Sequence, residues 1–427
     1  MRISIPARIP ISPLAGAACL WLVAWSSLAD DWAQWRGPHR DGVSAEKGLL
    51  RSWPKDGPPL VWQVADLGAG YSTPAIVGDQ VYLLSNEGLE NEYVQARSAR
   101  DGRRLWSTRL GNVGNPKQDP NFPAARSTPV VDGKALYALG SDGDLVCLET
   151  TTGKERWRKS LRADFGGQPG IWAYAESPLL DGEQLICTPG GSNATLVALS
   201  KNTGAVLWRC AVPGGDEASY SSAIVVEVGG VRQYVQFLAK GLVGVDAKSG
   251  KFLWRYDKTA SGSPAVILTP IVEKDLIYSG AYRAGGGLIK LKPVQGGIEP
   301  EQLYFSPKLP IGNGGVVKVG DHFYGSTSQA YLCVAFASGE IKWAQRTDPA
   351  ASCYADGCLY LHAENGEVVL LEPSPEAFHE LGRFAPPELP KRTDAMEKAW
   401  AYPVIANGRL YIRDVGKLWC YDVAAKR

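Results

Sequence analysis

Polar and aromatic side chains recur in the loops just before the proline-led apolar strands of this chain. Their types suit the binding of small polar molecules or peptides, because aromatic faces stack on rings and cations, guanidinium groups bind carboxylates, and carboxylates bind amines or cations. The alternative is a set of structural contacts in which Arg126 and Glu176 pair with each other or with neighbouring loops. The candidate binding residues are Tyr71, Arg126, Trp172, Tyr174, Glu176, Tyr220, Asn313, Trp400 and Tyr402.

Signals for catalysis are weak by comparison. The four histidines, at positions 39, 322, 362 and 379, have none of the short spacings that build a transition-metal site. The sequence also lacks a Gly-x-Ser-x-Gly elbow, a phosphate-binding Gly-Lys-Ser/Thr loop and a His-Glu-x-x-His motif. We therefore assign no catalytic residue and no metal ligand, and we favour a protein that is not an enzyme while leaving enzymatic activity open.

The composition favours an all-β fold. The 427 residues include 48 Gly, 29 Pro and 14 Trp but only 2 Met, which is poor in helix formers and rich in strand and turn residues. The 45 Lys and Arg residues nearly balance the 44 Asp and Glu residues, so the net charge is +1. A chain without a basic field is not expected to bind nucleic acid.

Two sequence elements recur with a period of roughly 40 to 50 residues. The first is a proline followed by β-branched residues, a tight turn and an apolar-Tyr pair, which predicts two short strands joined by a hairpin turn. Clear copies begin near residues 74, 129, 178, 270 and 403, and degenerate copies begin near Ser222, Gly315 and Ser352.

The second element is another strand followed by Gly-x-x-x-Trp. The Gly–Trp pairs are 102 and 106, 153 and 157, 204 and 208, 250 and 254, and 339 and 343. Because a Trp repeated at one position of each unit is better explained by packing between units than by ligand binding, we expect a structural docking role. The expected docking residues are Trp62, Trp106, Trp157, Trp208, Trp254 and Trp343.

Together the two elements predict four strands per period, which is the content of one β-propeller blade. The proline-led starts number eight, but the last copy has only three strands before the chain ends at Arg427. The segment from Pro58 to Gln63 is a Trp-bearing fourth strand with no blade before it. We predict an eight-bladed propeller closed by this N-terminal strand, with seven blades as the alternative if a degenerate copy does not form.

These motifs resemble the exported PQQ-like (pyrroloquinoline-quinone-like) β-propeller repeat proteins, over nearly all of the chain after its first 29 residues. Beyond the repeat, residues 32–38 (Trp-Ala-Gln-Trp-Arg-Gly-Pro) and 400–403 (Trp-Ala-Tyr-Pro), with the closing residues 410–414 and 420–422, are similar to the opening and closing signatures of the members that are not dehydrogenases. The resemblance implies the eight-bladed fold with tryptophan docking. The opening and closing signatures carry no chemistry by themselves.

The resemblance leaves three functions open. The first is a non-catalytic scaffold that binds a protein, peptide or polysaccharide through its loop face, without a cofactor. The second is a role like that of the outer-membrane assembly propeller. The third is a dehydrogenase that uses PQQ and calcium, for which Glu176, Asn313, Trp172 and Arg126 match by residue type, although the adjacent Cys pair and an identifiable Asp base are missing.

Cysteine usage suggests packing rather than a disulfide framework. Cys147, Cys333 and Cys420 occupy the third-strand position that is Ala or Gly in other copies, a small-residue slot. Cys353 and Cys358 flank one hairpin turn, and the sequence leaves their disulfide state open. It also does not pair Cys187 with Cys210.

The first 29 residues read as a secretory signal, with Arg2 and Arg8 followed by an apolar run and a Ser-Leu-Ala cleavage site. An uncleaved membrane anchor is the alternative. We expect an N-terminal extension at residues 30–56 and the propeller at residues 57–427. The mature protein is then expected to be a monomer in the periplasm or cell envelope, without a transmembrane span.

Overall fold

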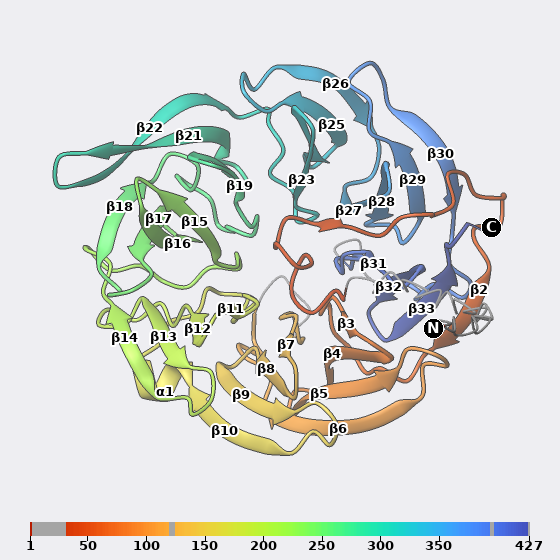
Figure 1. The fold of residues 1–427 in the computed structure, drawn as a ribbon, viewed down its shortest axis with the longest axis horizontal. Coiled ribbons are helices and arrows are strands. Elements are labelled where there is room, and N and C mark those ends of the chain that lie inside the picture. The colour runs from red at the N-terminus through yellow and green to blue at the C-terminus, as the bar shows by residue number, and fades with distance from the viewer. Residues whose placement is uncertain (2–30, 119–123, 393–396, 426–427) are drawn as a thin grey trace.

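The computed structural model describes residues 1, 31–118, 124–392 and 397–425. It is an all-β ring of eight blades around a central axis, as Figure 1 shows. The prediction of an eight-bladed propeller is confirmed, and all three degenerate repeats form blades. The predicted signal sequence lies outside the described residues. Within the described part, α1 (Leu161–Phe165) is the one α-helix, and no helix there is long and apolar enough to cross a membrane.

The first four blades follow one another along the chain. Blade A contains β3 (Ala75–Val77), β4 (Gln80–Glu87), β5 (Asn91–Ser98) and β6 (Arg104–Gly111); blade B contains β7 (Val130–Asp132), β8 (Ala135–Leu139), β9 (Asp144–Glu149) and β10 (Glu155–Ser160); blade C contains β11 (Leu179–Asp181), β12 (Gln184–Cys187), β13 (Leu196–Ser200) and β14 (Val206–Cys210); blade D contains β15 (Ile224–Val228), β16 (Val231–Phe237), β17 (Leu242–Asp246) and β18 (Phe252–Tyr256).

The other four blades complete the ring. Blade E contains β19 (Ile271–Glu273), β20 (Leu276–Ala281), β21 (Gly285–Val294) and β22 (Gly297–Ser306); blade F contains β23 (Val316–Val319), β24 (His322–Ser326), β25 (Ala330–Ala335) and β26 (Ile341–Arg346); blade G contains β27 (Ala350–Ala355), β28 (Cys358–Ala363), β29 (Val368–Glu372) and β30 (His379–Phe384), with β1 (Val43–Ser44) on its inner side; blade H contains β31 (Val404–Ala406), β32 (Arg409–Asp414), β33 (Lys417–Asp422) and β2 (Leu60–Val64).

Blade H closes the ring by joining the two ends of the repeat. β2 pairs antiparallel with β33, with Leu60 opposite Tyr421 and Trp62 opposite Cys420. This is the closure predicted from the orphan fourth strand. Because pairing within a ring removes the free ends that an open array of blades would expose, the closure stabilises both terminal segments.

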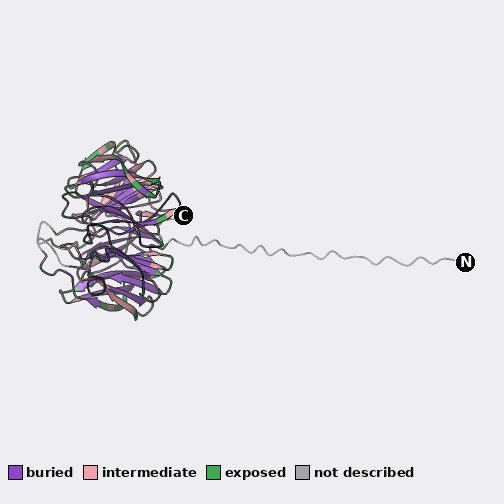
Figure 2. Cartoon of the chain, turned by 90° about the vertical axis from the view of Figure 1, so that its left-hand side faces the viewer, coloured by how far each residue is buried: buried purple, intermediate pink, exposed green. Residues whose placement is uncertain are grey.

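The buried side chains form clusters that run between neighbouring blades, and Figure 2 shows the buried residues concentrated in the stacked strands. Outer-strand aromatics cross these boundaries. The indole Nε1 of Trp62 donates to Ala99 O at 2.9 Å, that of Trp106 donates to Thr150 O at 2.9 Å, and equivalent bonds leave Trp157, Trp208 and Trp343. Each bond therefore joins one blade to the turn between the third and fourth strands of the next.

Blades D and E depart from this pattern. Trp254 donates to Gln233 Oε1 within blade D, because blade E has a longer hairpin, β21–β22, in place of the short glycine turn. Blade E has no Trp in its outer strand. There, Tyr304 takes over the contact, and its hydroxyl donates to Phe336 O of blade F at 2.9 Å.

The third-strand slot lies directly opposite these indoles. Cys147 pairs with Trp157, Cys333 with Trp343, and Ala96 with Trp106 across neighbouring strands. A small side chain is needed there because the large ring beside it fills the space between blades. The seven cysteines of the described residues are all buried and free, so Cys353 and Cys358 are not joined in the structure.

Candidate binding face and filled axis

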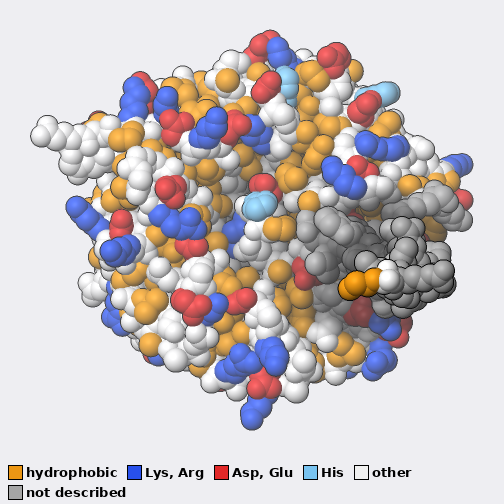
Figure 3. All heavy atoms as spheres, in the orientation of Figure 1, with side chains coloured by type: hydrophobic (Ala, Val, Ile, Leu, Met, Phe, Trp, Pro, Cys, Tyr) orange, Lys and Arg blue, Asp and Glu red, His pale blue; other side chains and the backbone are white. Residues whose placement is uncertain are grey.

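The axis of the ring is occupied by the chain itself. Residues 31–44, which we call the axial segment, cross the centre of the ring in red in Figure 1. Trp32 exchanges two backbone hydrogen bonds with Ile76 of blade A, at 2.8 and 2.9 Å. Ala33 O accepts from Val131 N of blade B at 2.9 Å. Figure 3, in the same orientation, shows side chains covering the centre of this face.

Side chains of the axial segment reach further blades. Arg40 donates to Ser177 O at 2.8 Å and to Pro178 O at 3.1 Å in blade C, and Trp35 Nε1 donates to Thr269 Oγ1 before blade E at 2.9 Å. Arg36 donates to Val316 O in blade F, and Ser44 donates to Ile405 O in blade H. The segment therefore ties opposite sides of the ring to one another.

Residues in the left-handed conformation turn the axial segment so that its side chains contact these blades. Arg36 and Gly37 have φ angles of 60° and 82°, and Arg40 has a φ of 59°. A side chain at residue 37 would place its Cβ 2.9 Å from the Trp32 ring, so glycine is required by both conformation and space. Sequence reasoning recognised the Trp-Ala-Gln-Trp-Arg-Gly-Pro motif but missed the role of its residues at the axis, since nothing local in a motif shows which distant blades it contacts.

Glu176 is one of the predicted binding residues, and it lies against this segment. Its carboxylate is buried and accepts from Thr188 N. Burial raises the pKa of Glu176 to about 7, and the Thr188 hydrogen bonds and the Arg40 charge oppose that rise. Burial lowers the pKa of Arg40 to about 9, against the charge of Glu176. Glu176 is thus the nearby counter-charge of a buried arginine.

A second group of predicted residues forms an aromatic cluster around Arg126. The Tyr71 and Trp400 rings lie 4.9 Å apart, and the Arg126 guanidinium carbon lies 5.2 Å from the first centroid and 5.9 Å from the second. Trp172 and Tyr220 form a neighbouring pair with centroids 5.5 Å apart. Burial lowers the pKa of Arg126, and the nearby Tyr71 and Tyr220 oppose that shift. Arg126 therefore stacks on aromatic rings.

The remaining predicted residues lie elsewhere. The Tyr174 hydroxyl donates to Pro189 O at 2.8 Å, inside a buried wall between blades B and C. The Tyr402 hydroxyl donates to the backbone carbonyl of Asn313 at 2.7 Å, and the Tyr402 ring meets Trp35 at 4.6 Å. The nine residues thus divide among the aromatic cluster, the axis and the wall.

The PQQ and calcium site that the resemblance left open does not fit these residues. A calcium ion at Glu176 would face the Arg40 guanidinium, whose charge would repel it. Asn313, the second candidate calcium ligand, lies beside blade F, whereas Glu176 lies beside blade C. The axial segment joins these two blades through Arg40 and Arg36. Among the described residues no group of three or more His, Cys, Asp or Glu side chains is placed to hold a metal ion.

The face that carries the blade-to-blade connections also has exposed apolar side chains. We call it the loop face: the end of the ring with those connections and the turns between second and third strands. Leu89, Ile171 and Tyr282 lie in these segments with exposed fractions of 45%, 57% and 44%. Exposed apolar residues on a loop face are typical of contact surfaces between proteins.

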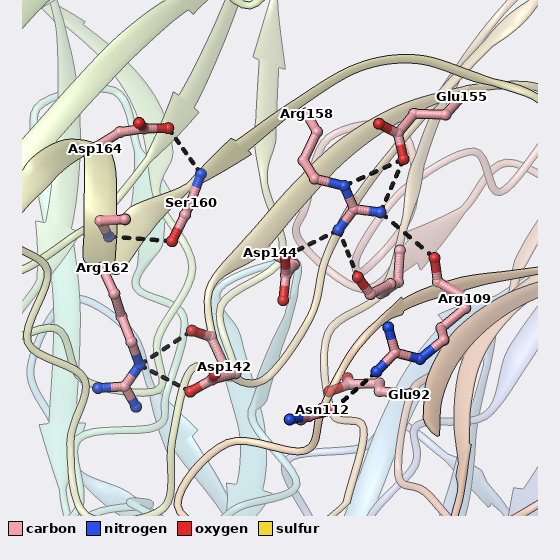
Figure 4. Close-up of polar contacts among 12 residues, drawn as sticks. Glu92, Arg109, Asn112, Asp142, Asp144, Glu155, Arg158, Ser160, Arg162 and Asp164 are labelled. Atoms are coloured by element: carbon pink, nitrogen blue, oxygen red, sulfur yellow. Dashed lines mark hydrogen bonds and ion pairs between the residues drawn. The ribbon is translucent and has the colours of Figure 1, made fainter. Parts of the chain in front are cut away.

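Charged side chains of blades A and B and of α1 form polar contacts with one another, as Figure 4 shows. Arg158 donates to Asp144 Oδ1 at 2.9 Å and to Glu155 Oε2 at 2.8 Å. Arg162, in α1, pairs with Asp142 at 2.9 Å. The Arg162–Asp142 pair links α1 to the β8–β9 turn, whereas the Arg158 pairs link β10 to β9 and lie within β10 itself.

Comparison with known proteins gives a consistent picture. The sequence model of a family described as outer membrane protein assembly factor BamB matches residues 90–345. The chain is similar to that assembly factor from Nitrosomonas eutropha, with 25% identity over 249 residues, covering 57% of this chain and 52% of the relative. It is also 26% identical over 203 residues to a quinohemoprotein alcohol dehydrogenase from Comamonas testosteroni, covering 44% of this chain and 26% of that enzyme. The chain therefore spans about half the length of the assembly factor and about a quarter of the enzyme.

Solved structures share the fold. The BamB structure from Moraxella catarrhalis superposes with a TM-score of 0.58 at 15% identity, covering 86% of this chain and 98% of that one. The quinohemoprotein alcohol dehydrogenase from Comamonas testosteroni gives 0.51 at 14% identity, covering 93% and 81%. At these identities the similarity speaks for the propeller fold alone. The match over residues 90–345, more than half of the chain, shows that this protein belongs to the family described as outer membrane protein assembly factor BamB.

Proposed function

We propose that this protein is a non-catalytic scaffold of the cell envelope that binds a protein partner through its loop face and acts in outer-membrane protein assembly. The observation that carries the proposal is the filled axis. Because residues 31–44 join blades across the centre of the ring, a partner has the faces of the ring available rather than an open central channel. Membership of the assembly-factor family supports a protein as partner over a peptide or polysaccharide.

The exposed apolar residues of the loop face locate the proposed contact. Ile171 and Tyr282 are exposed on segments anchored to rigid blades, which suits a surface that binds without large rearrangement. The aromatic cluster of Tyr71, Arg126 and Trp400 lies in the connections of the same face and holds blades A, B and H in register. We therefore expect contact at the loops and a structural role for the cluster.

The test is site-specific photo-crosslinking in cells that make the protein. A crosslinker at residue 171 or 282 should capture an integral outer-membrane protein or a component of its assembly machinery, identified by mass spectrometry. Leu207 is the matched control, because it is 52% exposed but lies in the outer strand β14. Equal capture at residue 207, or capture of unrelated proteins only, would contradict the proposal.

A genetic arm tests function at the same residues. Deletion of the gene should lower the amount of folded outer-membrane β-barrel proteins, and the wild-type gene should restore it. The Ile171→Asp/Tyr282→Asp variant should fail to restore it, whereas Leu207→Asp should succeed. Addition of PQQ and calcium to the purified protein should leave its melting temperature unchanged, and a saturable increase would instead favour the dehydrogenase alternative.

A further inference from the structure

The boundary between blades G and H lacks the contact that joins most neighbouring blades. At the regular boundaries an outer-strand Trp donates its indole N–H to a carbonyl after the third strand of the next blade, as Trp106 does to Thr150 O at 2.9 Å. In blade G this position is Gly382, because Gly382, like Trp343 of blade F, pairs with the last third-strand residue before the bulge. Blade G therefore provides no docking indole.

Residues 46–57 of the N-terminal extension, which we call the seam latch, supply the missing bond. Figure 1 shows this part of the chain running from the axis toward β2 between blades G and H. The carbonyl of Val423 is equivalent to that of Thr150, since both lie three residues after the small third-strand slot. Val423 O accepts from Leu50 N at 2.8 Å. A backbone N–H of the seam latch thus takes the place of an indole N–H.

The seam latch also supplies an aromatic ring. Trp53 takes the space beside Gly382, where an added Cβ would lie 3.0 Å from the Trp53 Cβ. The Trp53 ring packs on Tyr360 and Phe384 of blade G, with centroid distances of 5.8 and 5.3 Å. Phe384 in turn lies against Gly57, 2.5 Å from where a Cβ would be. One ring from the seam latch and one from blade G therefore fill this boundary.

The contacts that hold the seam latch are isolated and partly exposed. Leu49 N donates to the Asp356 carboxylate of blade G at 2.9 Å. The Arg51 guanidinium lies 3.7 Å from the same carboxylate, but the Arg51 side chain is 61% exposed. The indole N–H of Trp53 is buried and has no hydrogen-bond partner among the described residues. An exposed ion pair adds little to stability, and an unsatisfied buried donor lowers it.

The boundary between blades D and E also lacks an indole bond between blades, but it is held differently. Leu291 and Ile298 of the β21–β22 hairpin are buried in one cluster with Trp254 of blade D. Both strands of this hairpin are ten residues long and pair along their whole length, so the bridging element is part of blade E itself. At the boundary between blades G and H the bridging element is remote in sequence, and a cleft of about 610 Å³ lies between the seam latch and the end of β30.

We propose that the ring opens at the boundary between blades G and H, and that release of the seam latch is the opening step. Elsewhere the docking group belongs to one of the two blades that it joins. Here it belongs to a segment that can leave while both four-stranded sheets stay paired, which is the condition for local opening below the cost of global unfolding. The opening uncovers the faces of Tyr360 and Phe384 and is independent of any partner on the loop face.

Hydrogen exchange of the full chain, followed by mass spectrometry, tests the proposal. In the wild type, the seam latch and residues 423–425 should exchange before the β21–β22 hairpin. Trp53→Ala should speed exchange in the seam latch and at the end of β30 by about tenfold or more, and leave blades B and C unchanged. Trp106→Ala is the matched control, because it removes a docking ring at the boundary between blades A and B and should act there instead.

A disulfide lock gives a second readout in a chain that keeps Trp53. Leu49 and Ala424 form an antiparallel bridge flanked by two backbone hydrogen bonds of 2.8 Å, a kind of pair whose Cβ atoms lie close enough for a disulfide. The oxidised Leu49→Cys/Ala424→Cys variant should exchange at this boundary about tenfold more slowly than its own reduced form. Equal exchange in the two forms, or a wild type that opens first between blades D and E, would overturn the proposal.

Discussion

Glu92 joins blades A and B through a carboxyl group with no exposed surface. It accepts from Ser141 N at 2.9 and 3.1 Å, and also from the Ser141 hydroxyl. Figure 4 places it beneath the Arg109 and Asp144 side chains of the loop face. Burial raises the pKa of Glu92 to about 7, with the Ser141 hydrogen bonds opposing the rise. At the residue scale, the blades are thus joined by polar groups as well as by aromatic rings.

The raised pKa predicts a pH dependence of stability. The folded state holds the Glu92 proton more tightly than the unfolded chain, so the contribution is complete below pH about 4.5 and is lost as the pH rises to about 7, by up to about 1.4 kcal/mol per pH unit. Glu92→Gln should remove this loss, so its melting temperature relative to the wild type should rise between about pH 5 and pH 8. Glu227→Gln, at an exposed site, is the control. A difference that does not change with pH would contradict the assignment.

The cysteines give a second prediction at this scale. All seven in the described residues are buried and free, and burial raises the pKa of Cys147 to about 11. A water-soluble thiol reagent should therefore react slowly with the native protein and react at all seven positions after unfolding without reductant. Recovery of five thiols would instead indicate one disulfide, with Cys353 and Cys358 as the first pair to examine.

At the scale of the element, each blade is completed by its neighbour. The turn between third and fourth strands presents a glycine to the indole of the preceding blade, and the same turn supplies the carbonyl that accepts from the indole N–H. A Cβ at Gly153, for example, would lie 2.5 Å from the Trp106 ring. The repeated Gly-x-x-x-Trp spacing thus encodes both sides of the contact, one on each blade.

Substitution of Gly153 and of Gly133 separates the steric effect of an added side chain from its effect on backbone conformation. Gly153 has a φ of 70° and touches Trp106, whereas Gly133 has a φ of 55° with nothing near its Cβ position. Gly133→Ala should cost about 1 kcal/mol of unfolding free energy for the left-handed conformation alone. Gly153→Ala should cost a further 1–3 kcal/mol, roughly, because the ring must move. Denaturant titration of both variants measures the difference in unfolding free energy. Equal losses in the two variants would show that the Trp106 contact adds nothing to the cost of the substitution at residue 153.

At the scale of the whole molecule, residues before the repeats close the ring in two ways. β2 completes blade H at the circumference, and the axial segment connects blades at the centre. Strand packing in the ring joins neighbouring blades, and the axial segment adds contacts between blades that are not neighbours. The N-terminal residues therefore convert a series of neighbour contacts into one cooperative body.

Truncation separates the two closures. A chain that starts at residue 45 keeps β2 but lacks the axial segment, and it should stay soluble with a lower melting temperature. A chain that starts at residue 65 also lacks β2, which leaves β33 as an exposed edge strand, and it should aggregate. Thermal melts and size-exclusion chromatography measure both effects. An unchanged melting temperature after removal of residues 31–44 would contradict the role assigned to the axial segment.

The repeat by itself determined the fold. Spacing, turn residues and the orphan strand at Pro58 were enough to predict eight blades and their closure, because each blade is a local unit whose strands are neighbours in sequence. The positions of the candidate residues were a different matter. Their sequence positions placed them in the loops before the proline-led strands, but did not separate the Arg126 cluster from the buried Glu176.

Only the tertiary structure decided what fills the axis. Arg36 contacts Val316, which is 280 residues away in the sequence, and Arg40 contacts Ser177, which is 137 residues away. Such contacts exist only after the ring has closed, so no local spacing in residues 32–40 could reveal them. For the same reason, the sequence did not show that Tyr304 takes the place of a docking Trp in blade E. The partner of Tyr304 lies on the next blade, and the repeat pattern describes single blades rather than the contacts between them.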